Sequence, residues 1–402
     1  MEEVSFLETH RRFEVTAVEA YQAPISAKTT WILLRLSFAS GVSGWGEATL
    51  FGCEADLATL VARLQASLKV EPARDLADLV NRILQADMSG ARGVFASSLE
   101  QAWLDGLGRL ASAPVHCLLG GAERDHVPFY ANINRGIADR SPTGFAERAE
   151  RILKETGAQA LKIAPFDGLR WDRTPLKEQS RLIDSGLQRV AAVKAKLGGG
   201  QRLMVDCHAR FSPFLAGPLF GELGALGVYW VEEPCAMMHL SAREQRSLRH
   251  TANAAGLMLA GAETVTRLEE MQDVLSCEGH DVVLPDLRMT GISAGMAMLR
   301  LAASKQVFAS LHNPVGPVLD AVSTQVALAA PSFLILERQI GETPKFDEIR
   351  KTTVSCVDGA IELQSAPGLG FVPEIAALED LNAARSDGAL SFSGMAGAGP
   401  DA

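Results

Sequence analysis

Six short apolar runs in the second half of the chain each lead into an acidic residue or a histidine. Apolar runs of this length, bounded by polar residues, are typical of parallel strands that are covered on both faces. The side chains that follow the runs are Asp206, Glu232, Glu263, Asp286, His312 and Glu337. In a closed parallel barrel the carboxyl ends of the strands meet at one mouth. The sequence therefore predicts that six side chains capable of acid–base or metal chemistry face one small volume.

Strand-like and helix-like segments alternate from Val127 onward, and this alternation predicts an α/β fold with a barrel of the (β/α)8 type. Strand-like runs recur about every 25 to 40 residues, which is the spacing of such a barrel. Amphipathic stretches separate them, for example at residues 143–156, 179–196, 241–255 and 267–275. An open, doubly wound sheet is the alternative, but it gives no reason for so many charged strand ends.

The chain before the barrel has a different pattern. Residues 13–48 resemble an antiparallel meander, and residues 55–119 follow helical spacing, an order that indicates a separate α+β unit. After the barrel the alternation stops, and the Gly-, Ala- and Ser-rich stretch from about residue 386 is expected to be a loose tail. We therefore predict an α+β domain at 1–126, a barrel at 127–340, and a C-terminal segment at 341–402 that returns to the first domain.

Composition excludes several classes of protein. The net charge of −10 argues against a nucleic-acid surface, which needs clustered lysine and arginine. No apolar run has the length of a membrane span, and residues 1–5 lack the basic start of a signal peptide. The six cysteines show no CxxC pair, so we expect buried thiols in a reducing compartment and a cytoplasmic location.

Three of the strand-end acids belong to consecutive strands: Asp206, Glu232 and Glu263. Any one of them alone is best interpreted as a surface acid at the start of a loop. Three carboxylates at one rim repel each other, and a divalent cation relieves that repulsion. An all-carboxylate site with room for water and substrate oxygens suits Mg²⁺ better than zinc. We therefore predict a Mg²⁺ site at these three residues.

The same arrangement of strand ends supplies candidates for proton transfer. Residues i and i+2 share a face of a strand, so His208 is expected to point into the same mouth as Asp206. His312 is a candidate base because Asp286 is expected beside it and would raise its basicity. Lys162 is the cation at the end of the second strand, and Glu337 would donate a proton if burial raises its pKa.

A carboxylate substrate explains why these groups would lie together. A divalent cation that holds a substrate carboxylate makes the adjacent carbon acidic, and a base then removes its proton. A second base on the other face would return the proton and racemise the substrate. An acid near a β-hydroxyl would instead expel water.

The chain resembles members of the enolase superfamily, in the mandelate racemase (mandelate racemase/muconate lactonizing enzyme-like) subgroup, over almost its full length. The motifs that carry the resemblance are Gly44-Trp45-Gly46-Glu47, Leu118-Leu119-Gly120-Gly121, Val231-Glu232-Glu233-Pro234, Pro285-Asp286 and Leu336-Glu337. The resemblance implies that the first domain caps the barrel mouth, with loops near residues 24–30 and 51–54. It also implies a Mg²⁺ cofactor, a small-molecule carboxylate substrate and a homo-oligomer, with no nucleic-acid or membrane partner.

The resemblance assigns roles as well. It implies metal ligands at Asp206, Glu232 and Glu263, a His–Asp dyad at His312 and Asp286, and an electrophilic acid at Glu337. The segments 206–210 and 312–317 resemble the sugar-acid dehydratases of the subgroup, galactonate dehydratase among them, in which the histidine at the position of His208 protonates the departing hydroxyl. Lys162 would then support the charge of the enolate, and Arg210 would bind the substrate or pair with an acid.

Two alternatives remain open at the level of sequence. Racemases of the subgroup have a Lys-x-Lys motif where this chain has Lys162-Ile163-Ala164, so the second lysine is missing. A racemase or epimerase of a 2-hydroxy acid would need Lys162 or His208 as its second base. A non-catalytic metal-binding homologue is the other alternative, because Ala164 is also compatible with a relaxed site.

Overall fold

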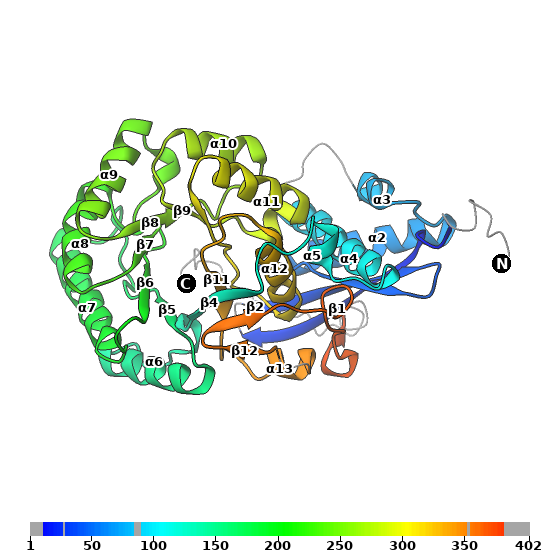
Figure 1. Ribbon diagram of the computed structural model, residues 1–402, viewed down its shortest axis with the longest axis horizontal. Helices are drawn as coiled ribbons and strands as arrows, with labels where there is room; N and C mark the ends of the chain where they lie inside the picture. The colour runs from blue at the N-terminus through cyan, green and yellow to red at the C-terminus, as the bar shows by residue number, and fades with distance from the viewer. Residues whose placement is uncertain (1–10, 27–28, 84–89, 352–353, 382–402) are drawn as a thin grey trace.

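The computed structural model describes residues 11–26, 29–83, 90–351 and 354–381. Figure 1 shows a ring of alternating strands and helices on one side, and the N-terminal strands and helices beside it. None of the helices in these ranges is long and apolar enough to cross a membrane.

Eight parallel strands in the described part of the chain form a closed barrel, which confirms the predicted fold. They are β4 (His126–Asn132), β5 (Ala160–Ile163), β6 (Arg202–Asp206), β7 (Trp230–Glu232), β8 (Met258–Gly261), β9 (Val282–Val283), β10 (Phe308–Ala309) and β11 (Leu336–Gln339). Closure comes from β11, which pairs with β4 in the register Leu336 to Phe129, and from a parallel bridge between Ala309 and Phe333.

Helices connect the strands, as expected for parallel neighbours. They are α6 (Pro142–Thr156), α7 (Leu176–Lys194), α8 (Pro213–Ala225), α9 (Ala242–Ala254), α10 (Leu268–Ser276), α11 (Leu287–Ser304) and α12 (Pro317–Ala329). The four amphipathic stretches predicted from sequence coincide with α6, α7, α9 and α10.

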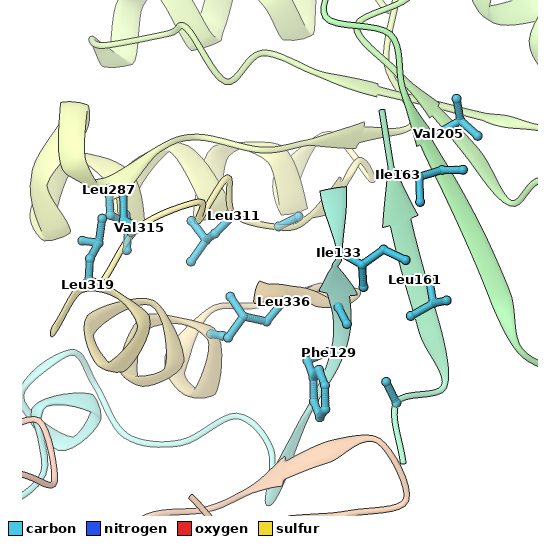
Figure 2. Packing of buried hydrophobic residues seen from close by; sticks show 14 of the residues in the cluster. Phe129, Ile133, Leu161, Ile163, Val205, Leu287, Leu311, Val315, Leu319 and Leu336 are labelled. Atoms are coloured by element: carbon cyan, nitrogen blue, oxygen red, sulfur yellow. The ribbon is translucent and has the colours of Figure 1, made fainter. Parts of the chain in front are cut away.

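The period of two along each strand divides the core into an outer and an inner layer. Leu161, Ile163, Val205 and Leu336 belong to the outer layer, in the cluster shown in Figure 2. The inner layer is a separate apolar cluster that includes Tyr130, Ala160, Met204, Trp230 and Ile335.

Two positions further along each of these strands, the inward side chain changes from apolar to polar. The residues at those positions are Asn132, Lys162, Asp206, Glu232 and Glu337. The strands therefore place a polar layer directly above an apolar plug, at the carboxyl end of the barrel.

The N-terminal unit contains an antiparallel sheet, in agreement with the predicted meander. Its strand order is β14-β1-β2-β3, with β1 (Val15–Ser26), β2 (Thr29–Phe38), β3 (Ser43–Glu47) and β14 (Glu379–Asp380). The accompanying helices are α2 (Glu54–Val70), α3 (Leu76–Ile83), α4 (Gly90–Leu110) and α5 (Val115–Leu118). Strand β3 lies against α4 because Gly44 and Gly46 have no side chain; a Cβ on Gly46 would lie 2.0 Å from the Ser98 carbonyl oxygen.

The C-terminal segment contributes to both units. After α13 (Lys345–Arg350), the hairpin of β12 (Cys356–Val357) and β13 (Ala360–Glu362) pairs antiparallel with the start of β4. Strand β14 then joins the N-terminal sheet, through β1. The domain boundaries at 126/127 and 340/341 remain predictions, and the expected tail at 386–402 lies outside the described residues.

The cysteines differ from the expectation of six buried thiols. Cys207 and Cys235 are buried, whereas Cys117 and Cys356 are exposed. Cys117 lies on α5 and Cys356 on β12, both outside the barrel core. The sequence around them has no apolar pattern from which their exposure could have been predicted.

Candidate active site

A cavity of about 220 Å³ opens at the carboxyl ends of the barrel strands. Its lining includes five of the residues predicted from sequence: Lys162, Asp206, His208, Glu263 and His312. Glu232, Asp286 and Glu337 are buried directly behind this lining, with no more than 1% of each side chain exposed. The structure therefore brings eight of the nine predicted side chains together.

His312 and Asp286 form a close pair. Nδ1 of His312 lies 2.9 Å from Oδ2 of Asp286, and its Nε2 lies 3.3 Å from Oε2 of Glu263. Burial alone would lower the pKa of His312, but Glu263 and Asp286 raise it to about 9. Burial alone would raise the pKa of Asp286, but the Arg288 guanidinium and His312 lower it to about 2. Asp286 is thus ionised at neutral pH and fixes one nitrogen of the imidazole ring.

Lys162 lies between two buried carboxylates. Its Nζ donates to Oε1 of Glu232 at 2.6 Å and lies 3.0 Å from Oε1 of Glu337. Burial would lower the pKa of Lys162, but Glu232 and Glu337 raise it well above its usual value. Lys162 is therefore held as an ammonium ion and is a poor base in this arrangement.

The Glu337 carboxylate is also surrounded by donors. Oε1 accepts from Nδ2 of Asn132 at 2.7 Å, and Oε2 accepts from the backbone N–H of Asn313 at 2.9 Å. Burial raises the pKa of Glu337, but Lys162 and the other donors outweigh this, so that the pKa lies below its usual value. The raised pKa that proton donation by Glu337 requires is absent from this arrangement.

His208 reaches the cavity by a route that the strand rule did not predict. Strand β6 ends at Asp206, and His208 and Ala209 both adopt left-handed backbone angles, with φ of 47° and 53°. The turn brings Nε2 of His208 to 2.9 Å from Oδ2 of Asp206. Its Nδ1 is buried without a hydrogen-bond partner. The predicted proximity to Asp206 is observed, but a turn rather than strand alternation causes it.

The three predicted metal ligands fit a divalent cation by their chemistry. All three are carboxylates on adjacent strands or just beyond them, and Oε2 of Glu232 is buried without a partner. Burial and the repulsion of neighbouring carboxylates raise the pKa of Glu232 well above its usual value. A divalent cation would relieve both effects.

The same carboxylates are at present paired with cationic side chains: Glu232 with Lys162, Asp206 with His208, and Glu263 with His312. No group of three or more His, Cys, Asp or Glu side chains among the described residues converges closely enough to hold an ion as it stands. Oε2 of Glu232 nevertheless lies outside these pairs, since Lys162 contacts Oε1.

Arg210 does not line the cavity. Its Nη1 donates to the backbone carbonyl of Phe166 at 2.7 Å, which ties the loop after β6 to the loop after β5. No ion pair between Arg210 and an acid is observed among the described residues, and its expected role in substrate binding stays a prediction.

Sequence reasoning missed four polar residues of the lining: Asn132, Asn134, Arg135 and Arg288. Asn132 could have been found, because it ends the first barrel strand two positions after Tyr130. Arg135 and Arg288 lie beyond the strand ends, Arg135 in a 3-10 turn after β4 and Arg288 in the first turn of α11, where the period of the strand does not predict the direction of a side chain. The expected capping loops are not part of the described lining, which comes entirely from the barrel; of these loops, residues 27–28 lie outside the described residues.

Comparison with known proteins agrees with this architecture. Residues 12–120 match the N-terminal domain of mandelate racemase and muconate lactonizing enzyme, and residues 144–377 match the enolase C-terminal domain-like family. The chain thus belongs to the mandelate racemase/muconate lactonizing enzyme family of the enolase superfamily. Enzymes of this superfamily use a lysine or histidine base together with a divalent metal ion.

Particular relatives are similar over most of their length. A D-xylonate dehydratase from Haloferax volcanii is 27% identical over 92% of this chain and 89% of its own. A D-galactonate dehydratase from Xanthomonas euvesicatoria is 25% identical over 89% of this chain and 91% of its own.

A solved structure of a provisionally assigned dehydratase from Zymomonas mobilis has a TM-score of 0.77 and 21% identity, and covers 90% of this chain and 97% of its own. At this level of identity, the similarity to the solved structure supports the fold alone.

Proposed function

We propose that this protein is a Mg²⁺-dependent dehydratase of a sugar acid, which removes the proton next to the carboxylate and then eliminates the β-hydroxyl as water. The product would be a 2-keto-3-deoxy acid. The observation that carries the proposal is that two histidines, His312 and His208, line one small cavity and each contacts a carboxylate. The relatives named as D-xylonate and D-galactonate dehydratases support the same class of substrate.

His312 would accept the α-proton on Nε2. Asp286 holds the opposite nitrogen, so the ring is oriented with Nε2 toward the cavity side, where Glu263 now lies 3.3 Å away. Glu263 is one of the anions that raise the pKa of His312 to about 9. A cation that engages Glu263 would therefore lower this pKa and free the base at neutral pH.

His208 would protonate the departing hydroxyl. The α C–H bond breaks toward His312, a carbon–carbon double bond forms, and the β C–O bond breaks as the hydroxyl takes a proton from His208 and leaves as water. Nδ1 of His208 has no hydrogen-bond partner but is buried, so the imidazole would have to turn for this nitrogen to meet a substrate oxygen. The resulting enol then tautomerises to the 2-keto acid.

The remaining buried groups would stabilise negative charge. Lys162 is an ammonium ion at the floor of the cavity, so it would stabilise the substrate carboxylate or the enolate through its charge. Glu337 would position this ammonium through its ion pair with it, and Asn132 in turn donates to the Glu337 carboxylate. The arrangement thus favours a positioning role for Glu337 over proton donation.

The carboxylates of Asp206, Glu232 and Glu263 would hold Mg²⁺. When bound, the ion would polarise the substrate carboxylate and make the α-proton more acidic. A homo-oligomer is expected on the grounds of family resemblance, and light scattering of the purified protein tests the oligomeric state. The cytoplasmic location stays an expectation from the sequence.

The racemase alternative is less well supported by the geometry. It needs a free second base, but Lys162 is an ammonium ion held by two carboxylates. Ala164 stands where the Lys-x-Lys motif has its second lysine. Only His208 would remain for that role.

A substrate screen tests the proposal. The purified protein is incubated with a panel of mono- and diacid sugars, with Mg²⁺ or with EDTA, and 2-keto acid formation is followed by derivatisation of the ketone. We expect Mg²⁺-dependent product from at least one sugar acid with the wild type and none with His312→Asn. Absence of a 2-keto acid from every member of a stereochemically complete panel would contradict the proposal.

A further inference from the structure

The carboxylate of Glu47 belongs to the N-terminal sheet but binds the backbone of the barrel. Glu47 is the last residue of β3, and its side chain is completely buried. Oε1 accepts from the N–H of Gly316 at 2.8 Å, and Oε2 accepts from the N–H of Leu319 at 3.0 Å. The hydroxyl of Thr49 donates to Oε1 at 2.8 Å and completes the set of donors.

These contacts cap helix α12 from another part of the chain. The first N–H groups of a helix have no partner within the helix, and a negative charge at this end is favourable. Gly316 is the N-cap residue of α12 and Pro317 follows it, so neither has a side chain able to accept these hydrogen bonds. The close approach also requires glycine at 316, because a Cβ there would lie 2.9 Å from Oε1 of Glu47.

The capped segment carries one member of the catalytic dyad. Gly316 lies four residues after His312, and the loop between β10 and α12 joins them. Fixing the start of α12 therefore fixes the end of the short loop on which the imidazole is mounted.

A hydrogen-bond chain from the same residue leads to the other member of the dyad. The backbone N–H of Glu47 donates to Oε1 of Gln101 at 3.0 Å, and Nε2 of Gln101 donates to Oγ of Ser97 at 3.1 Å. Oγ of Ser97 then donates to the carbonyl oxygen of Leu287 at 2.7 Å, and Leu287 is the neighbour of Asp286.

Helix α4 also holds the first part of α11 at another point. The carboxylate of Glu100 accepts from the N–H groups of Ile292 and Ser293, at 2.8 and 3.0 Å. These groups follow the kink at Gly291 in α11, where φ is +76°. Side chains of the N-terminal unit thus bind backbone groups near the starts of both α11 and α12, the helices that follow Asp286 and His312.

We infer that Glu47 is a positioning residue for His312: its carboxylate fixes the start of α12, a contact we call the clamp, while its backbone N–H belongs to the hydrogen-bond chain that reaches the start of α11 beside Asp286. The role of this dyad in proton abstraction rests on the proposed function, whereas the clamp itself is a property of the fold. In this account the N-terminal unit has a part in the chemistry although none of its described residues lines the cavity.

Glu47→Gln tests the clamp, and Asp105→Asn is its matched control. The amide keeps the shape of the side chain but turns at least one acceptor oxygen into a donor that faces a backbone N–H. Asp105 is likewise completely buried and accepts from two backbone N–H groups, of Trp45 at 2.9 Å and Leu369 at 2.7 Å, and from Nε of Arg109 at 3.0 Å, but it contacts neither α11 nor α12. Both substitutions thus disturb a buried carboxylate, and only one disturbs the clamp.

Hydrogen–deuterium exchange followed by mass spectrometry measures how firmly these backbone segments are held, and it needs no substrate. We expect faster exchange in peptides covering 311–320 in Glu47→Gln, and wild-type exchange there in Asp105→Asn. Equal exchange in the two variants over this segment would overturn the inference, even if the protein dehydrated no acid at all. The exchange experiment can therefore contradict the role of Glu47 independently of whether the protein is a dehydratase.

The effect of Glu47→Gln on catalysis is measured with the substrate found in the screen. Misplacement of a catalytic group by about 1 Å can cost about 100-fold in rate, so we expect kcat of Glu47→Gln to fall about 10- to 100-fold with a KM changed less than about 3-fold. A kcat equal to that of Asp105→Asn would overturn the positioning role.

Ser97→Ala is the second variant in case Glu47→Gln does not fold. It removes a single hydroxyl, and we expect faster exchange over 285–293 with no change over 311–320. Unchanged exchange over 285–293 would contradict the chain of contacts from Glu47 to Leu287.

Discussion

Nδ1 of His312 lies 2.9 Å from Oδ2 of Asp286, at the carboxyl ends of adjacent barrel strands. The same oxygen of Asp286 also accepts from the Arg288 guanidinium at 2.7 Å. Two donors on one oxygen keep Asp286 ionised and its position fixed, with a pKa lowered to about 2. The imidazole therefore has one nitrogen occupied and only the other available for proton transfer.

Replacing His312 tests its assignment as the base. We expect His312→Asn to lower the rate of α-proton exchange by about 10²- to 10⁴-fold, since this is the usual contribution of a positioned general base. His126→Asn is the control, because His126 is exposed at the start of β4, at the opposite end of the barrel. Comparable loss in both variants would show that the effect is not specific to the dyad.

Replacing His208 separates the two chemical steps. We expect His208→Asn to retain exchange of the α-proton in D₂O but to lose water elimination by at least about 100-fold. Asparagine suits the site because it tolerates the left-handed backbone that His208 adopts at φ 47°. Loss of exchange and elimination to the same degree would contradict the assignment of His208 as the acid.

Stabilisation by Mg²⁺ is expected to depend on Glu232 and not on its neighbour Glu233. Saturating Mg²⁺ is expected to stabilise the wild type by about 2.7 kcal/mol at one hundred times its dissociation constant, measured as a rise in the unfolding midpoint. We expect this rise to disappear in Glu232→Gln and to persist in Glu233→Gln.

Glu233 is the control because it is partly buried beside Glu232 but accepts from the backbone N–H of Ala262 at 2.7 Å. Burial and nearby Glu263 raise its pKa to about 8, so the amide is a close mimic of the side chain at neutral pH. A rise that survives in Glu232→Gln would show that the ion does not bind at the predicted ligands.

A buried ion-pair cluster away from the cavity predicts how stability depends on pH. Asp320 lies 2.9 Å from Nη2 of Arg338 and 2.7 Å from Nη1 of Arg350, and all three side chains are largely buried. Burial raises the pKa of Asp320, but the two guanidinium groups outweigh it and lower the pKa below its usual value of 3.8. Its stabilising effect is thus present above pH 3.8 and is lost as the pH falls through the lowered pKa.

We expect Asp320→Asn to reduce the free energy of unfolding at pH 7 by about 3 to 5 kcal/mol, because two buried guanidinium groups lose their partner. The difference from wild type should shrink as the pH falls below about 4. Urea unfolding at several pH values measures both effects. Glu150→Gln, at an exposed pair with Lys196, is the control and should change little at any pH.

The sequence contains most of the information that places the strand-end side chains. Alternation along a buried strand puts Lys162, Asp206 and Glu232 on the inward face, two positions after Ala160, Met204 and Trp230. This regularity holds because backbone hydrogen bonds to both neighbours leave a strand of the barrel only two directions for its side chains. The barrel and its polar layer could therefore be predicted from the order of the amino acids alone.

Residues beyond the strand ends could not be placed in the same way. Arg210 is in a loop whose path is set by the contact of its guanidinium with the Phe166 carbonyl, and no local pattern encodes that partner. His208 was placed correctly for the wrong reason, since a left-handed turn orients it. The Glu47 contacts join residues 269 and 272 positions apart, and such a pairing depends on how the two units pack.

Proton NMR in D₂O tests the central proposal most directly. The wild type and His312→Asn are incubated with Mg²⁺ and a panel of sugar acids and simple 2-hydroxy acids. Our account predicts that one sugar acid loses its β-hydroxyl and yields a 3-deoxy-2-keto acid with deuterium at C3, in the wild type alone. Deuterium at the α-carbon of a substrate that keeps all its hydroxyls would contradict dehydration and identify a racemase or epimerase instead.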